Sequence, residues 1–181
     1  MNPKSAIAIT TLILSAGAAN ANILFDVYAG GTYGIGGNTM FVSNNNISKS
    51  AQTYGAVLGI DIPLVRIELE YNYLDSNKFT TNLGMLNAYF KIPTPIIKPY
   101  IGAGIGSTFD AKYTPRNLPE IEIDNKFACQ GMLGITLNLP AIPFNIDIEG
   151  RALYAPNAFK IANDDVKILQ YDGRVKLRYI F

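Results

Sequence analysis

Apolar and polar residues alternate along most of this chain, in segments as long as β-strands. In residues 127–139, for example, every second residue is apolar or glycine, while Gln130 and Thr136 belong to the opposite phase. A repeat of two residues places the two kinds of side chain on opposite faces of a sheet. Eight such segments are present, at residues 25–35, 54–62, 65–73, 86–92, 101–105, 127–139, 144–154 and 169–181. The pattern therefore predicts an all-β protein with eight strands.

Charge separates the two phases completely. The apolar phase carries no charged residue in any of the eight segments. The opposite phase carries seven acidic and seven basic residues, which are Asp26, Asp61, Arg66, Glu68, Glu70, Lys91, Lys126, Asp147, Glu149, Arg151, Asp172, Arg174, Lys176 and Arg178. Two architectures give such an alternation: a soluble barrel or sandwich with the apolar face inside, and a transmembrane barrel with the apolar face toward lipid.

The lengths of the connections favour the membrane barrel. The short, proline-containing connections are 62–64, 93–95 and 140–143, and the long ones are 37–50, 109–125 and 155–167, with a shorter loop near 75–78. Long and short connections therefore fall at opposite ends, as in outer-membrane barrels with short periplasmic turns. Aromatic residues also gather near both ends of the strands, where membrane interfaces favour them. We expect an eight-stranded antiparallel up-and-down transmembrane β-barrel.

The N-terminus has the pattern of a secretory signal peptide. Lys4 precedes an uncharged stretch at residues 5–19, and the small-x-small sequence of residues 19–21 is typical of a cleavage site before Asn22. The stretch is shorter than the roughly 20 apolar residues that span a bilayer as a helix. We therefore expect a cleaved signal peptide at residues 1–21 and a single barrel domain at residues 22–181.

Composition narrows the possible functions. The 181 residues include 15 Lys and Arg, 14 Asp and Glu, no His and one Cys, which gives a formal net charge of +1. Such a balance offers no basic field for nucleic acid. Without His, the chain lacks His-based metal sites and the Ser-His-Asp and Cys-His types of catalysis. We therefore expect a protein that is not an enzyme, has no metal site and no cofactor, and does not bind nucleic acid.

Three segments carry a resemblance to a known family. They are 98–106 (KPYIGAGIG), 147–154 (DIEGRALY) and 173–181 (GRVKLRYIF). With them the chain resembles the small outer-membrane β-barrels that include OmpA/OmpX-type and opacity-type surface proteins. The resemblance implies a Gram-negative outer membrane as the location, with its lipid and lipopolysaccharide around the barrel. It also implies that Tyr179 and the terminal Phe181 form the insertion signal that the barrel-assembly machinery reads.

The interior of an eight-stranded barrel is just wide enough for side chains to fill it. Glycines in the polar phase, such as Gly59 and Gly102, leave room there for long side chains. We expect a network of charges in the lumen, made of Arg66, Glu68, Glu70, Asp147, Glu149, Arg151, Arg174, Lys176 and Arg178. Counting from the turn pairs Asp147 with Arg178 and Glu149 with Lys176, within a register of two residues. The balance of signs favours a closed plug over an ion-selective pore.

Four classes of function remain open. The first is a monomeric, non-enzymatic surface scaffold whose extracellular loops, such as 37–50 and 109–125, contact a host or envelope ligand. The second is a narrow pore for ions or small solutes. The third is a barrel enzyme that uses a carboxylate pair such as Glu68 and Glu70 as acid and base. The fourth is a secreted, lipocalin-like binder with its apolar face inward.

Overall fold

The computed structural model describes residues 25–42, 45–76, 79–113, 121–123, 126–139, 142–161 and 164–181. These residues form one antiparallel sheet of nine strands. The strands are β1 (Asp26–Val42), β2 (Asn45–Asp61), β3 (Val65–Ser76), β4 (Phe79–Lys91), β5 (Ile97–Tyr113), β6 (Ile121–Ile123), β7 (Lys126–Asn138), β8 (Phe144–Ile161) and β9 (Asp164–Ile180). The described part of the chain contains no helix long and apolar enough to cross a membrane.

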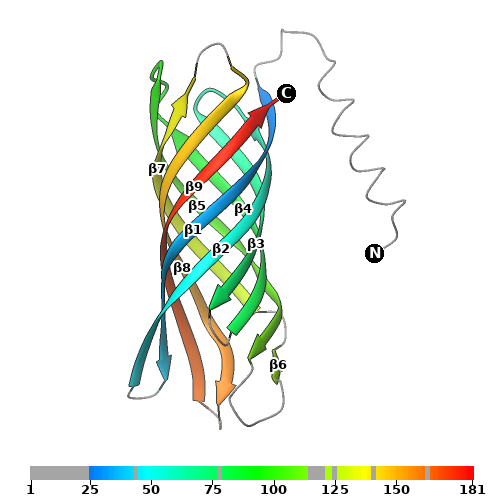
Figure 1. Cartoon of the computed structure of the whole chain (residues 1–181), viewed down its shortest axis with the longest axis vertical. Coiled ribbons are helices and arrows are strands. Elements are labelled where there is room, and N and C mark those ends of the chain that lie inside the picture. The colour runs from blue at the N-terminus through cyan, green and yellow to red at the C-terminus, as the bar shows by residue number, and fades with distance from the viewer. Residues whose placement is uncertain are drawn as a thin grey trace, which may run out of the picture.

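Eight of the strands close into a barrel (Figure 1). Each pairs with two neighbours, and the ring closes where β1 pairs with β9 and β4 pairs with β5. The short β6 stands apart, since it pairs only with the outer end of β5, from Ala111 to Tyr113. Closure pairs the backbone groups of each barrel strand with its neighbours, as a lipid environment demands. The predicted eight-stranded antiparallel barrel is therefore confirmed.

The two ends of the barrel differ. One end, which we call the turn end, carries Phe25, Phe181 and the connections that follow β2, β4 and β7, and it lies uppermost in Figure 1. Backbone hydrogen bonds hold these connections, such as the 2.8 Å bond from Ile62 N to Val65 O. The opposite end, which we call the hairpin end, carries the tips of β1 and β2 and of β8 and β9. In outer-membrane barrels the short turns face the periplasm.

The long loops predicted at the hairpin end are wrong in their extent. Most of 37–50 and 155–167 is strand, because β1 and β2 pair as far as Val42 and Asn45, and β8 and β9 as far as Ile161 and Asp164. These strands have 17 or 18 residues, whereas about 9–11 suffice to cross a membrane. Outside the membrane neither face of a hairpin needs to be apolar, so strand pairing continues there without the alternation that reveals it.

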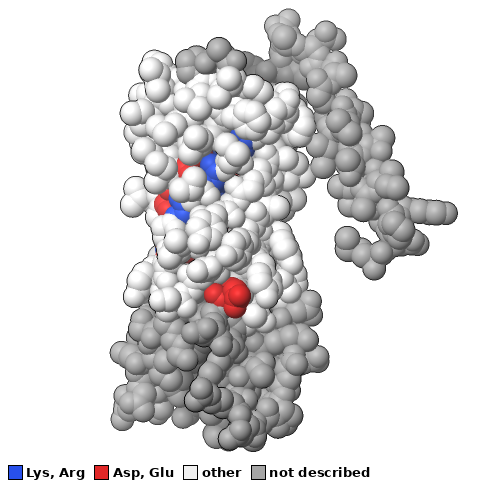
Figure 2. All heavy atoms as spheres, viewed as in Figure 1, with Lys and Arg blue, Asp and Glu red and all other residues white. Residues whose placement is uncertain are grey.

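The apolar phase faces outward and the charged phase faces the lumen. Leu133 is 69% exposed and Ile101 is 64% exposed, whereas Arg66 and Lys176 in the lumen are fully buried. In the space-filling view, most of the described face is free of charge and only small patches of red and blue show (Figure 2). A water-soluble protein has the reverse arrangement. The exterior therefore fits lipid, and the lipocalin-like interpretation is wrong.

Aromatic side chains form clusters near both ends of this exterior. Toward the hairpin end, the rings of Tyr33 and Tyr54 lie 5.2 Å apart, and Tyr73 pairs with Tyr54 across β2 and β3. At the turn end, the ring of Tyr179 lies 5.2 Å from both Phe144 and Phe181. Amphipathic rings favour the two membrane interfaces, so the lipid-facing band lies between these clusters.

The outward face can be tested at Leu133, in the middle of β7. Leu133→Arg should lower the free energy of unfolding in lipid vesicles by about 2–4 kcal/mol, because the charge would lie in hydrocarbon. Leu133→Ile, which keeps the face apolar, should cost less than about 1.5 kcal/mol. Urea titration of the two variants in vesicles measures the difference. Equal stabilities would show that this face does not meet lipid.

Candidate functional site

Charged side chains fill the lumen, and those nearest the turn end form a chain of ion pairs. Arg66 Nη1 lies 2.9 Å from Asp147 Oδ2, and Arg178 Nε lies 2.9 Å from the same oxygen. Arg178 Nη1 also lies 3.2 Å from Asp61 Oδ2, and Asp61 in turn pairs with Lys91. Two carboxylates are thus shared among three cations, which offsets the high cost of burying each charge.

The middle of the lumen centres on Glu68. Lys176 Nζ lies 2.6 Å from Glu68 Oε1, and it lies 3.8 Å from Glu149 Oε2. Two phenols also donate to Glu68, from Tyr28 at 2.7 Å and from Tyr89 at 2.9 Å. One carboxylate therefore accepts three hydrogen bonds, as a buried anion requires.

The outermost charged layer joins two acids to two arginines. Arg174 pairs with Glu70 and, through Nε, lies 3.0 Å from Asp172 Oδ1. Arg151 Nη2 lies 2.6 Å from Asp172 Oδ2, and Arg151 Nη1 lies 3.8 Å from Glu70 Oε1. The four residues form a closed ring of alternating sign, which spans β3, β8 and β9 and ties the walls of the barrel together.

Tyrosines on the wall hold the arginine side chains in place. The Arg66 guanidinium lies over the rings of Tyr89 and Tyr100, at 4.0 and 4.7 Å from their centroids, and that of Arg178 lies 4.6 Å from the Tyr28 centroid. Such cation–π contacts stabilise a desolvated guanidinium. The Tyr100 hydroxyl also donates to a carboxylate, at 3.0 Å from Glu149 Oε2.

Glycines leave the space that these tyrosines occupy. A Cβ added at Gly134 would lie 2.7 Å from the Tyr100 hydroxyl oxygen, and one added at Gly102 would collide with the ring of Tyr89. The expected role of the lumen glycines thus applies to tyrosine rings as well as to long charged side chains. A methyl group at either position would displace a ring that contacts Arg66.

Beyond the charges, toward the hairpin end, the lumen also contains apolar side chains. Leu74, Leu83 and Leu153 point inward from β3, β4 and β8 and are buried, as are Ala51 and Ala155. They are mixed with polar side chains, since the buried Thr53 and Thr81 lie opposite Leu74 on the two neighbouring strands. These inner apolar residues were not predicted, because the lumen network was identified from charged residues alone.

The structure places all nine charged residues of the expected network in the lumen, each at most 4% exposed. The pairing differs in detail from the expectation. The Cα partners are Asp147 with Lys176 and Glu149 with Arg174, two residues from the count made along the turn. Because long side chains lean diagonally, Arg178 still reaches Asp147, whereas Lys176 lies closer to Glu68 than to Glu149.

Several lumen partners were not expected from sequence. Asp61, Lys91 and Asp172 were assigned to the inner phase but not to the network, and the roles of Tyr28 and Tyr89 were not anticipated. Tyrosine in the polar phase, across from a glycine on the next strand, is the signal that would have found the phenols. Within the described ranges, no group of three or more His, Cys, Asp or Glu residues is placed to hold a metal ion.

The expected insertion signal lies at the turn end. Tyr179 is the next-to-last residue of β9, and its ring contacts that of Phe181. Phe181 N donates a hydrogen bond to Val27 O at 2.9 Å, which extends the seam between β9 and β1. Both side chains are exposed on the outer face.

The pairing of Glu68 with Lys176 gives a quantitative test of the lumen. Glu68→Gln should lower the free energy of unfolding by about 3 kcal/mol, because it leaves Lys176 buried without its nearest partner. Lys176→Met should likewise leave Glu68 buried without its cation. The double variant should recover much of the lost stability, with a coupling energy of about 1 kcal/mol or more. Urea unfolding in detergent or lipid measures the free energy of unfolding of the wild type, the two single variants and the double variant.

A distant pair provides the control for this cycle. Glu68→Gln combined with Leu133→Ile on the outer face should be additive within about 0.5 kcal/mol. If the stability losses of the Glu68 and Lys176 variants were equally additive, the two side chains would not be coupled and their ion pair would not stabilise the barrel.

Comparison with known proteins bears on the fold. No family model and no curated protein matches the chain. Among solved structures, Neisserial surface protein A has 16% identity and a TM-score of 0.61, with 87% of this chain and 98% of that chain covered. The N-terminal β-barrel domain of Pseudomonas aeruginosa OprF has 15% identity and a TM-score of 0.54, with 84% and 97% covered.

A third similar structure is Ail, the attachment invasion locus protein of Yersinia pestis, with 13% identity, a TM-score of 0.50, and 85% and 99% of the two chains covered. The outer membrane enzyme PagL is less similar, with a TM-score of 0.45. The chain thus has the fold of the small outer-membrane β-barrels. Together with the apolar exterior of the barrel, this fold places the protein in a bacterial outer membrane.

Proposed function

We propose that this protein is a non-enzymatic scaffold of the outer membrane, with a closed lumen and with strand hairpins that contact a host or envelope ligand outside the cell. Lipid and lipopolysaccharide surround the barrel, which acts as a monomer. The barrel-assembly machinery recognises Tyr179 and Phe181 during insertion.

The burial of the lumen charges carries the proposal of a closed barrel. A water-filled pore leaves its lining accessible to solvent, whereas Arg66, Lys176 and Arg178 are fully buried. Each of these cations is paired with a carboxylate. A selectivity filter also shows an excess of one sign, while the signs balance in this lumen. These observations support a plug over a pore.

The same pairing argues against acid–base chemistry in the lumen. Glu68 and Glu70 are adjacent on the inner face of β3, but Glu68 accepts from Lys176 and Glu70 pairs with Arg174. Both carboxylates are nearly inaccessible to solvent. A general acid or base needs to reach its substrate within hydrogen-bonding distance, and these groups are held by their partners instead.

The long hairpins support a role in contact outside the cell. The β1–β2 ladder continues to Val42 and Asn45, and the β8–β9 ladder to Ile161 and Asp164. Rigid scaffolds commonly present binding residues in this way. The Yersinia pestis protein with this fold is named for attachment and invasion and was solved with a heparin analogue, and we propose contact of the same general kind for the hairpins here.

Current through planar bilayers tests the closed lumen. The wild-type barrel should pass no steady current, because its lumen is filled. Replacing both Glu68 and Lys176 by Ala removes a central pair without changing net charge and should produce a measurable leak. Leu133→Ile is the control and should stay closed. A steady, ion-selective current through the wild type would instead establish the pore as the function.

Cleavage on intact cells tests which end is exposed. A protease site inserted at residues 43–44, between β1 and β2, should be cut by protease added outside. The same site inserted at Pro63, at the turn end, should be cut only after the outer membrane is permeabilised. The reverse pattern would invert the proposed orientation.

Adherence of cells then tests the contact itself. Replacing residues 39–48 by an Asn-Gly turn shortens the β1–β2 hairpin while keeping the strands in register. Bacteria carrying this variant should adhere less to host cells than those carrying the wild type at equal surface expression. Unchanged adherence after shortening of this hairpin and of β8–β9 would remove the support for a ligand at the hairpin end.

A further inference from the structure

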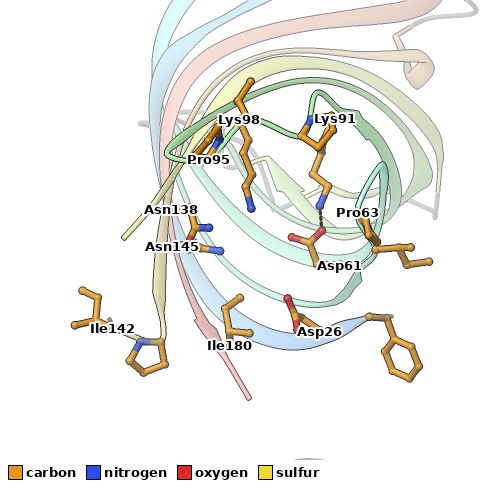
Figure 3. A pocket seen from close by; sticks show the side chains of 15 residues that line it. Asp26, Asp61, Pro63, Lys91, Pro95, Lys98, Asn138, Ile142, Asn145 and Ile180 are labelled. Atoms are coloured by element: carbon orange, nitrogen blue, oxygen red, sulfur yellow. Dashed lines mark ion pairs between the residues drawn. The ribbon is translucent and has the colours of Figure 1, made fainter. Parts of the chain in front are cut away.

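The turn end of the barrel holds a cavity of about 740 Å³. Its polar lining, which we call the cup, comprises Asp26, Asp61, Lys91, Thr94, Lys98, Asn138 and Asn145. Figure 3 shows these side chains around the open end of the barrel. The cup is blind, because the buried ion pairs of Arg178 with Asp61 and Asp147 lie beneath it. It is therefore a binding-sized hollow and not the entrance to a channel.

The rim of the cup is rigid. Pro63, Pro93, Pro95 and Pro143 stand in the connections that surround it, and proline fixes the backbone φ angle. Backbone hydrogen bonds of 2.8 Å hold the neighbouring segments, from Asn138 N to Ile96 O and from Ile180 N to Pro143 O. A site formed in advance loses little conformational entropy when a ligand binds.

Two charges of opposite sign in the cup lack an ion-pair partner among the described residues. Asp61 and Lys91 are paired with each other, as the dashed line in Figure 3 shows, but Asp26 and Lys98 are not joined to any charge. Asp26 begins β1 and Lys98 lies at the start of β5, and β1 and β5 are four strands apart in the ring of eight. An unpaired acid and an unpaired base thus face each other across the cup.

Two amides lie along the wall that joins these charges. In the order β5, β7, β8, β9, β1, Lys98 comes first, followed by Asn138 at the end of β7, Asn145 at the start of β8 and finally Asp26. Figure 3 shows both amides pointing into the cup. An amide offers both donors and an acceptor. The order along the wall is therefore cation, two amides, anion.

We propose that the cup binds a short zwitterionic peptide from the periplasm. Lys98 would receive its carboxylate, Asp26 its ammonium, and Asn138 and Asn145 the peptide groups between them. A peptide presents these three groups in the complementary order. The hairpins face the other side of the membrane, so this site is independent of the proposed contact outside the cell.

Titration with trialanine, followed by NMR on the barrel in detergent micelles, tests the proposal. Resonances of the Asn138 and Asn145 side-chain amides should shift with saturation. Capping either end of the peptide, as N-acetyl-trialanine or trialanine amide, should weaken binding about two- to five-fold, as expected for loss of one exposed charged contact.

Variants assign each end of the peptide to its residue. Lys98→Met should weaken the binding of trialanine by a similar factor but leave the binding of trialanine amide unchanged. Lys98→Arg should bind trialanine as the wild type does. Asp26→Asn should weaken the binding of trialanine and leave the binding of N-acetyl-trialanine unchanged. Asp75→Asn, which alters an exposed acid at the hairpin end of β3, is the matched control and should have no effect.

The outcomes are distinguishable, provided that each variant keeps the NMR spectrum of the folded barrel. Absence of saturable shifts at millimolar trialanine would overturn the proposal. Equal binding of the free and capped peptides would also overturn it, since the charges would then play no part. The site would be established if Lys98→Met affected only peptides with a free carboxylate and Asp26→Asn affected only peptides with a free ammonium.

Discussion

The structure depends on the rule that a charge buried in the barrel needs a partner of opposite sign. The interior of eight strands has room for side chains but little for water, and an isolated ion would cost several kcal/mol there. Arg174, for example, reaches both Glu70 and Asp172. Apart from the contact of Arg174 with Asp172 inside β9, the lumen ion pairs described above join different strands, as Arg174 joins Glu70 on β3. The network that neutralises the lumen therefore also fixes how the walls of the barrel face one another.

Lipid on the outside imposes the second requirement, which is that the sheet has no open edge within the membrane. The pairing of β1 with β9 meets it. Together the two requirements explain the reversed arrangement of the chain, in which Leu133 is exposed and Arg66 is buried. They also explain why the strand ladders can continue past the membrane at the hairpin end, where neither face of the sheet has to be apolar.

The sequence predicted those features that follow from alternation alone. The faces of a segment such as β7 could be assigned because Leu133 and Gln130 belong to opposite phases. The register of strand pairing could not be assigned, since a shift of two residues leaves every side chain on the same face. Asp147 accordingly lies opposite Lys176 instead of Arg178. The extent of the hairpins was missed for a related reason, because strands outside the membrane carry no pattern. Uncharged lumen residues such as Leu153 were missed because the network was predicted from charge alone, although the position of Tyr89 opposite Gly102 could have indicated its role.

The position of the cations along the chain has a consequence for biogenesis. Arg174, Lys176 and Arg178 all belong to β9, which is synthesised after the other barrel strands, while acids that they neutralise lie on β3 and β8. An intermediate without β9 thus has an open seam beside β1 and uncompensated carboxylates inside. Docking of the last strand removes both defects in one step. The distribution of charge therefore favours complete assembly, because the lumen becomes neutral and the barrel closes only when the last strand is in place.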